Sequence, residues 1–536
     1  MTLLGSSPAP HARDAWPGAP DPAHTRLHDG IPHLVEETTP EHAQTADLLA
    51  LARIFEDAAL RPLLVRRTSG GPALALDVRE KDAALRALTA DGGLWAAART
   101  AGRPAHLLVT GAEDAFEKDA AIVFRPRITP SGTLRHGAET GVRVEFWRHE
   151  DGLVRAPRRN ALTRRTIMAE DLSFATVRRH GRSWRTLDGM FAPGPHEVAF
   201  DVDIVFSWVD GSSDDFQRER AKRLNAYVVG DGDAHAARFR QVDELRYALR
   251  SVHLFAPWIR RIYIATDSPA PRWLVDHPKV RIVRSEEFFA DPSVLPTHNS
   301  HAVEAQLHRI PGIAEHFLYS NDDMFFGRPV RPELFFTPAG LTKFVECGVR
   351  IGVGPARASR SGHDNAARVN RDLLRERFGR IITRDLQHCA TPHSREVMGE
   401  LEREFPDEFA RTTAARFRSA TDVSVTNSLY HYYAAMTGRA LPTREPRTRY
   451  IQTTLRNAPA RLGRLLERRD ADMFCLNDGS VPEIPEELRE HVVRETLEAY
   501  FPVRAPWERD ESALSRRWPE APSAGEGHPS APSKAG

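Results

Sequence analysis

The sequence predicts an α/β protein with a mostly parallel, Rossmann-like sheet, helical additions to that sheet, and a small α/β module before it. Two observations support this fold class. Between residues 199 and 345, short apolar runs of strand length alternate with amphipathic segments of helix length, which is the pattern of parallel strands joined by crossover helices. The chain also has 536 residues and a hydrophobic fraction of 41%, which is enough to bury more than one core.

Composition excludes several classes of protein. The 74 basic and 73 acidic residues give a net charge of +1, whereas bulk nucleic-acid binding needs an excess of cations. No apolar run reaches the roughly 18 residues of a membrane-spanning helix, and the first twenty residues carry prolines and charges where a signal peptide is apolar. Cys347, Cys389 and Cys475 lie far apart, so neither a disulfide framework nor a CxxC metal site is expected.

Four segments are expected along the chain. Residues 1–35 and 509–536 are rich in Pro, Ala and charged residues, have little to bury, and are predicted to be disordered tails. Residues 36–198 are expected to form the N-terminal α/β module, whose role the sequence does not indicate. Residues 199–508 are expected to form the main domain.

Apolar runs predict strands in the N-terminal module, and amphipathic segments predict helices. The strands are expected at 63–65, 73–78, 107–110 and 142–147, and the helices at 81–89 and 94–100. The segment 155–165 is strongly basic (RAPRRNALTRR). A solvated surface segment is favoured for it over a patch that faces phosphate.

Elements of the main domain follow from the same patterns. In chain order we expect a strand at 203–208, a helix at 243–255, strands at 262–265 and 280–283, a helix at 299–310 and a strand at 317–320. The segment 348–365 has glycines and arginines but little to bury, so it is predicted to be a mobile loop. Beyond it, helices are expected at 366–378, 394–405, 409–417, 423–437 and 485–500, with a short apolar segment at 473–478 before the last.

Acidic residues follow three of the predicted parallel strands, at Asp210, at Asp267 and at the pair Asp322 and Asp323. In open α/β sheets, ligands bind in the crevice beyond the carboxyl ends of the strands. Carboxylates there are suited to Mg²⁺, which takes one or two of them together with substrate phosphates. A single Asp at a strand end more often caps a turn, but three such ends in one crevice favour a metal–phosphate site.

The predicted helix 299–310 carries a polar stripe. His301, Glu304 and His308 project within about 60° of one another, and a solvated face and a functional site explain such a stripe equally well. His393 and Arg418 are uninformative when they are considered alone.

Four stretches of the main domain resemble the conserved regions of the stealth proteins. The first, at 203–216, reads DIVFSWVDGSSDDF, and the second, within 244–330, contains ELRYALRSVHLFAPWIRRIYIATD and LPTHNSHAVEAQLHRIPGIAEHFLYSNDDMFFGRPV. The third, within 384–434, contains RDLQHCATPHSREVMGELEREFPDEF and RFRSATDVSVTNSLYHYYA, and the fourth, within 474–508, contains FCLNDG and FPVRAPWE. Several long motifs in the family's order make the resemblance specific, although it does not extend to the module before residue 199.

Stealth proteins are similar in activity to hexose-1-phosphate transferases, so the resemblance implies a nucleotide-sugar-transferase-like fold and that reaction. Sugar-1-phosphate would pass from a nucleotide sugar, expected to be UDP-linked, to a hydroxyl of a polysaccharide or glycolipid acceptor, with release of a nucleoside monophosphate. Mg²⁺ or Mn²⁺ is the implied cofactor. The large spacer domains of animal members are absent, which favours a bacterial enzyme of capsule or exopolysaccharide synthesis, located in the cytoplasm or peripherally at the inner face of the plasma membrane.

The resemblance also implies roles for individual residues. Arg418 would hold a phosphate with its planar guanidinium group, and His393 would accept the proton of the acceptor hydroxyl. Asp210 and Glu244 are expected to be catalytic as well, and Asp322, Asp323 and Asp478 to bind the metal. Other positions in the motifs are expected to bind substrate, namely Trp208, Asp267, Asn299, His301, His308, Arg309 and Asn321.

Two other functions remain open from the sequence. An ordinary metal-dependent glycosyltransferase would use the same acidic strand ends but would release a nucleoside diphosphate. A non-catalytic glycan-binding protein has no need of the acidic strand ends together with His393 and Arg418, which argues against it. The sequence indicates neither the donor sugar nor the oligomeric state.

Overall fold

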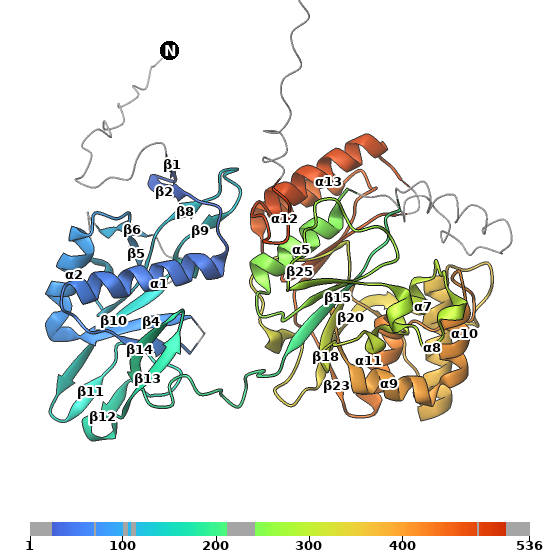
Figure 1. Ribbon diagram of the computed structural model, residues 1–536, viewed down its shortest axis with the longest axis horizontal. Helices are drawn as coiled ribbons and strands as arrows, with labels where there is room; N and C mark the ends of the chain where they lie inside the picture. The colour runs from blue at the N-terminus through green and yellow to red at the C-terminus, as the bar shows by residue number, and fades with distance from the viewer. Residues whose placement is uncertain are drawn as a thin grey trace, which may run out of the picture.

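The computed structural model describes residues 24–68, 71–99, 105–108, 114–211, 242–479 and 482–510. Most of the two predicted tails (1–23 and 511–536) therefore lies outside the described residues, as do the last two residues of the strand predicted at 107–110. Figure 1 shows two lobes, the N-terminal module in blue to cyan and the main domain in green to red. No helix in the described ranges is long and apolar enough to cross a bilayer.

An eight-stranded mixed sheet forms the centre of the N-terminal module, and α1 (Pro40–Asp57) and α2 (Lys81–Ala90) pack beside it. It confirms the predicted strands at 63–65, 73–78 and 142–147, and α2 confirms the helix at 81–89. The strands of this sheet are β3 (Leu63–Arg66), β4 (Pro72–Asp77), β5 (Ala96–Ala98), β6 (His106–Leu107), β7 (Ala120–Phe124), β10 (Val142–Glu150), β11 (Leu153–Arg155) and β12 (Thr166–Met168).

Two predictions for this module are wrong. The helix predicted at 94–100 is replaced by β5, whose three alanines are buried between β6 and β7, because periodicity alone does not separate a short buried strand from a helix. The predicted tail also contains ordered structure, since β1 (Thr25–His28) and β2 (Ile31–Val35) form an antiparallel pair. β8 (Arg127–Ile128) and β9 (Arg135–His136) complete that sheet, and β13 (Phe174–Arg179) and β14 (Arg182–Leu187) form a hairpin.

A five-stranded sheet in the order β17-β16-β15-β18-β22 forms the centre of the main domain. The first four strands are parallel and β22 is antiparallel, which confirms the predicted, mostly parallel α/β sheet. All four predicted strands are present, and the helix at 243–255 is α5 (Glu244–Phe255). The strands are β15 (Val202–Ser207), β16 (Ile262–Ala265), β17 (Val280–Val283), β18 (His316–Asn321) and β22 (Thr391–Ser394).

The helix predicted at 299–310 is shorter than expected. It consists of α7 (Ser300–Glu304) and a separate 3-10 turn (Leu307–Arg309). Between them, the Gln306 side chain is buried and accepts the Ala290 backbone N–H at 3.0 Å. This tertiary contact holds the chain in a conformation that the amphipathic pattern does not predict.

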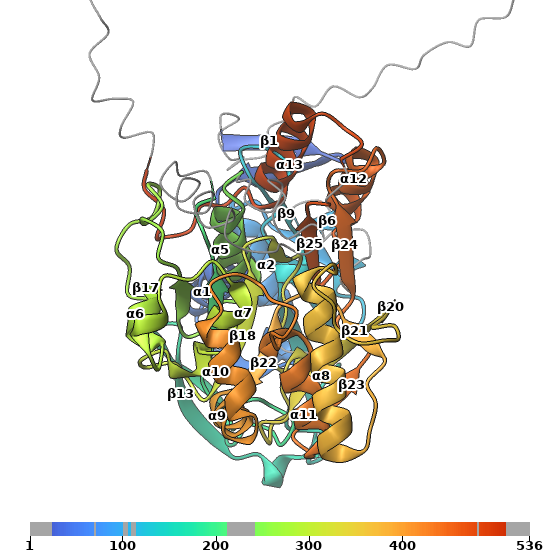
Figure 2. The ribbon, with the colours of Figure 1, turned by 90° about the vertical axis from the view of Figure 1, so that its right-hand side faces the viewer.

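Helices follow the central sheet and pack around it. α8 (Gly362–Phe378), α9 (Arg395–Glu404), α10 (Pro406–Ala414) and α11 (Tyr430–Met436) lie side by side in Figure 2, and a π-helical turn (Val425–Leu429) precedes α11. The predicted mobile loop at 348–365 is partly wrong, because β20 (Thr342–Arg350) and the start of α8 occupy its two ends. The remaining elements are short α6 (Ser285–Phe288), β19 (Met324–Phe326), β21 (Arg384–Leu386), β23 (Ala440–Thr443), β24 (Thr448–Gln452), α12 (Ala458–Arg468), β25 (Met473–Asn477) and α13 (Glu486–Tyr500).

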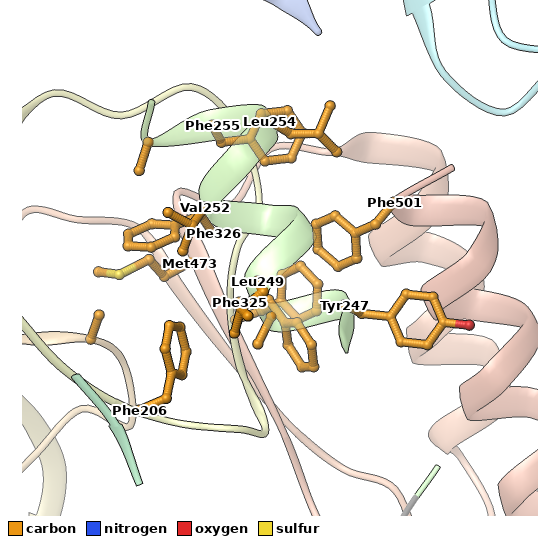
Figure 3. Packing of buried hydrophobic residues seen from close by; sticks show 14 of the residues in the cluster. Phe206, Tyr247, Leu249, Val252, Leu254, Phe255, Phe325, Phe326, Met473 and Phe501 are labelled. Carbon is orange, nitrogen blue, oxygen red and sulfur yellow. The ribbon is translucent and has the colours of Figure 1, made fainter. Parts of the chain in front are cut away.

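α5 lies at the centre of the larger hydrophobic core. Ten of its twelve residues are buried, and Figure 3 shows Leu249 and Val252 packed near Phe325, Phe326 and Phe501. These partners come from β19 and from the segment after α13, so the core joins distant parts of the chain around one helix. The position of Glu244, the first residue of α5, depends on this packing.

A buried ion-pair cluster fixes the C-terminal segment to α5, and its loss is expected to destabilise the protein. Arg246 and Arg250 donate to the Glu508 carboxylate at 2.6–2.7 Å, and the side chain of Glu508 is fully buried. Glu508→Gln removes the buried carboxylate charge that both arginines share, so we expect a loss of about 3 kcal/mol in the free energy of unfolding. Urea unfolding measures it, with the exposed Glu495→Gln as the matched control. Equal stability of the two variants would contradict the prediction.

Candidate active site

A cleft of about 480 Å³ opens where β15 and β18 end. Its lining comes from stretches that are distant in the sequence: the residues after these two strands, α7, the first turn of α8, the segment before β22, the π-helical turn and the end of β25. The cleft therefore lies beyond the carboxyl ends of parallel strands, where ligands bind in sheets of this type. Nine of the predicted site residues line it, namely Trp208, Glu244, Asn299, His301, Asn321, Asp322, Asp323, Arg418 and Asp478.

Four carboxylates form an acidic part of this lining: Glu244, Asp322, Asp323 and Asp478. Burial and the charge of Asp322 raise the pKa of Glu244 to about 7. Burial likewise raises the pKa of Asp323 to about 7, and the charges of Glu244 and Asp478 add to this effect. Carboxyl groups whose pKa values are raised in this way are crowded with negative charge that the protein balances incompletely.

Strand pairing brings these carboxylates together. The chain turns at Asp322 and Asp323 from β18 into β19, and β19 pairs with β25, which leads directly to Asp478. The Leu476 N–H donates to the Asp323 carbonyl at 3.0 Å, which fixes this register. Glu244 lines the same cleft from the start of α5, which packs against β19.

The acidic cluster has some of the features of a site for a hard divalent cation, but not all of them. In the described ranges, no three carboxylate, imidazole or thiolate groups already stand in a metal-binding arrangement. Within the described ranges, Asp323 Oδ1 is nevertheless buried without a hydrogen-bond partner, and its other oxygen accepts the Cys475 thiol at 3.4 Å. Arg489 balances some of the charge, because it donates to Asp478 at 2.6 Å and lies 3.8 Å from Glu244. Mg²⁺ is commonly bound by one or two carboxylates together with the phosphates of the substrate.

Arg418 contributes a cation to the cleft. Its Nη2 donates to Ser300 Oγ at 2.7 Å, at the start of α7. Asn299 caps that helix by accepting the His301 N–H, and its amide donates to Asp422 at 2.8 Å. Burial and the nearby Arg418 charge lower the pKa of His301, so its imidazole is neutral near pH 7.

A hydrogen-bonded network supports the middle of the cleft. Glu304 accepts the Thr426 hydroxyl at 2.8 Å, and the Tyr319 hydroxyl lies within hydrogen-bond distance of both Glu304 and Asn321. Glu304 was predicted only as a member of the polar stripe with His301 and His308. The network explains why its side chain is buried instead of solvated.

The structure places His393 outside the lining of the cleft. The residue lies on β22 and is 0% exposed, and its ring packs against Phe317, Tyr430 and His431 at 4.6–5.4 Å between centroids. Its Nδ1 is hydrogen-bonded to the Thr391 carbonyl at 3.0 Å. Burial and the His431 charge hold its pKa well below the usual value. This geometry suits a core residue and does not support the role of proton acceptor that was predicted for His393.

Four other predicted residues are likewise not among the lining residues. His308 and Arg309 both contact Glu402 at 2.9 Å and line a separate shallow pocket, because α7 ends before them. Asp267 is exposed and accepts the Ser285 N–H at the start of α6. Its carboxylate therefore caps a neighbouring segment, which was the alternative to metal binding for an aspartate at a strand end. Asp210 follows β15 next to residues 212–241, which lie outside the described ranges.

Several cleft residues were missed by the sequence reasoning. His363, His388, Asn427 and Arg489 all line the cleft. His363 fell within the segment predicted to be a mobile loop. A local signal was present, because Ser361 followed three residues later by Asp364 is a helix-capping pattern, and Ser361 Oγ does accept the Asp364 N–H.

Comparison with known proteins gives matches to four family models between residues 200 and 519. Stealth protein conserved regions 1, 2, 3 and 4 match residues 200–228, 238–344, 387–435 and 463–519, respectively. These ranges contain three of the four stretches on which the resemblance was based and nearly all of the third, which begins at residue 384, so the resemblance is confirmed.

Curated relatives match most of the chain. Exopolysaccharide phosphotransferase CpsY of Mycobacterium tuberculosis is 49% identical over 494 residues, which are 91% of this chain and 92% of that protein. An exopolysaccharide phosphotransferase of Nocardia farcinica is 58% identical over 71% of this chain and 75% of its own length, and one of Streptomyces coelicolor is 38% identical over 94% and 96%. The first and third matches extend far into the N-terminal module, which the family models do not cover.

Among solved structures, a galactosyltransferase in complex with donor and acceptor sugar analogues matches with a TM-score of 0.29 and 9% identity, over 59% of this chain and 99% of that chain. The four family models in their order, together with 49% identity over nine-tenths of the chain, are decisive. The chain belongs to the Stealth protein family.

Proposed function

We propose that this protein transfers sugar-1-phosphate from a nucleotide sugar, UDP-linked, to a hydroxyl of a polysaccharide or glycolipid acceptor. The products would be a phosphodiester and a nucleoside monophosphate, and the pathway would be the synthesis of an exopolysaccharide or capsule in the bacterial cytoplasm or at the inner face of the plasma membrane. The family and the names of the curated relatives support this function. The observation that carries it is the occurrence of Arg418 and the acidic cluster of Glu244, Asp322, Asp323 and Asp478 in the lining of one cleft.

Phosphoryl transfer needs position and charge neutralisation more than covalent chemistry from the protein. Arg418 would hold a phosphate of the donor through its planar fork of N–H groups. Asp322, Asp323 and Asp478 would hold Mg²⁺ or Mn²⁺, which would neutralise charge on the diphosphate. Glu244, with a pKa of about 7, would carry a proton in part of the molecules at neutral pH and so limit repulsion of the donor phosphates.

The remaining lining residues would bind and orient the substrates. Trp208 would offer an apolar surface, and the side chains of Asn299, His301 and Asn321 would offer polar contacts. We also propose that Asp210 lies beside the site, because it follows Val209, which lines the cleft after β15. The positions of Asp267, His308 and Arg309 do not support a substrate-binding role, so we do not propose one for them.

The fate of the β-phosphorus atom is expected to distinguish this reaction from its alternatives. With UDP-sugars labelled with ³²P at the β-phosphate, Mg²⁺ and a panel of glycan acceptors, sugar-1-phosphate transfer places the label in the glycan and releases unlabelled UMP. An ordinary glycosyltransferase, the second candidate, would leave the label in UDP. A glycan-binding protein would leave the donor intact. Chromatography of the nucleotides and the glycan measures all three outcomes, and label in UDP would contradict the proposal.

A further inference from the structure

The cleft contains a histidine–carboxylate pair that the family resemblance does not assign. His363, in the first turn of α8, lies with its Nε2 2.7 Å from Asp385 Oδ2 on β21. Asp385 Oδ1 accepts the Asn427 amide at 3.1 Å and the Leu386 N–H at 2.8 Å. Three separate elements therefore hold this pair in one arrangement.

The two members of the pair differ in exposure. The His363 side chain is 37% exposed and lines the cleft, whereas the Asp385 side chain is 11% exposed and lies behind it. A neutral imidazole that donates its Nε2–H to a carboxylate keeps the lone pair of Nδ1. The carboxylate fixes this tautomer and stabilises the imidazolium that forms when Nδ1 accepts a proton.

Close packing places the start of α8, which carries His363, beside Arg418. A Cβ atom on Gly362 would lie 2.8 Å from Cβ of Arg418, so α8 begins in direct contact with that side chain. The proposed phosphate-binding group and the histidine therefore approach the cleft together. A hydroxyl that attacks a phosphate held by Arg418 would arrive within the same space.

We propose that His363, oriented by Asp385, is the general base that accepts the proton of the acceptor hydroxyl. This inference rests on the function proposed above and replaces His393 in that role. The acceptor O–H bond breaks and its proton passes to Nδ1 of His363, while the acceptor oxygen forms a bond to the β-phosphorus. The bond between the β-phosphorus and the bridging oxygen breaks, and the nucleoside monophosphate leaves with that electron pair.

The charged groups around His363 favour this use. Burial lowers the pKa of the imidazole, but the hydrogen bond and the charge of Asp385 more than offset burial and raise the pKa above its usual value. The charge of Arg418 opposes this rise and that of Asp364 adds to it, while the ring of His388 lies 6.1 Å away. Such a base is protonated and inactive in acid, and it becomes active as the pH rises through its pKa.

The test compares variants of the full-length protein with the donor and glycan for which the wild type gives labelled product. His363→Ala is expected to lower kcat by about 100-fold and to leave the KM of the donor unchanged. Added imidazole should raise the rate of this variant, because the side chain that it replaces lines an open cleft. His491→Ala, which removes an exposed histidine on α13, is the matched control and should act like the wild type.

The pH profile gives a readout that a structural role would not change. The kcat/KM of the wild type should fall in acid with the pKa of His363, and Asp385→Asn should shift this limb to lower pH as well as lower the rate. Full activity of His363→Ala, or rescue of His393→Ala by imidazole, would overturn the inference. An inactive wild type would instead contradict the proposed function.

A second measurement does not depend on activity. Titration of the histidine ring signals by NMR should show His363 with a pKa above the usual 6.5 in the wild type and a lower pKa in Asp385→Asn. His393 should show no titration near neutral pH. An unchanged His363 titration in Asp385→Asn would show that the pair does not act as a unit and would overturn the inference.

Discussion

Arg418→Ala is expected to lower the rate of sugar-1-phosphate transfer by about 10³-fold. The guanidinium lines the cleft and is positioned by its hydrogen bond to Ser300. In phosphoryl transfer, a cation placed against the transferred or leaving phosphate stabilises charge that increases in the transition state. Arg418→Lys should recover only part of the rate, because lysine keeps the charge but not the planar fork.

The control for this variant is Arg416→Ala. Arg416 is exposed, lies two residues earlier and is not among the cleft residues, so its removal should leave the rate unchanged. Circular dichroism and thermal melting check that both variants fold. A rate for Arg418→Ala within tenfold of the wild type would contradict the role proposed for this residue.

Most of the central sheet could be predicted from the sequence. β15, β16 and β18 each contain a run of three or four apolar residues, as expected for parallel strands covered on both faces. Because parallel strands end at the same edge, the sequence alone predicts that Asp322 and Asp323 lie at the cleft. The same reasoning misplaced Asp267, since a strand-end aspartate can cap the next element instead of facing the crevice.

The parts that could not be predicted depend on contacts between distant residues. α7 ends at Glu304, because the buried side chain of Gln306 contacts the Ala290 backbone. His308 therefore does not lie on one helical face with His301 and Glu304. The surroundings of His393 and His363 also depend on contacts between distant residues. A sequence pattern does not reveal that the first is enclosed by Phe317 and Tyr430 and that the second has Asp385 behind it.

Asp323→Asn is expected to lower transfer by about 10³-fold and yet not to destabilise the protein when no divalent cation is added. Activity falls because the variant loses a carboxylate proposed to hold the cation that neutralises the diphosphate. The free energy of unfolding is not expected to fall with the activity. The pKa of Asp323 in the folded state is about 7, above its usual value. Ionisation of this buried carboxylate therefore lowers the free energy of unfolding as pH rises from about 4 to 7. At pH 8, Asn removes that cost.

Cation binding supplies the decisive comparison. A ligand that binds only the folded state at 100 times its Kd adds about 2.7 kcal/mol, so Mg²⁺ or Mn²⁺ should raise the melting temperature of the wild type by several degrees. The same addition should leave the melting temperature of Asp323→Asn nearly unchanged. Asp201→Asn, at an exposed position outside the cleft, should respond like the wild type. If Asp323→Asn melted below the wild type without cation and still responded to Mg²⁺ and Mn²⁺, Asp323 would be a structural residue and the acidic cluster would not be the cation site.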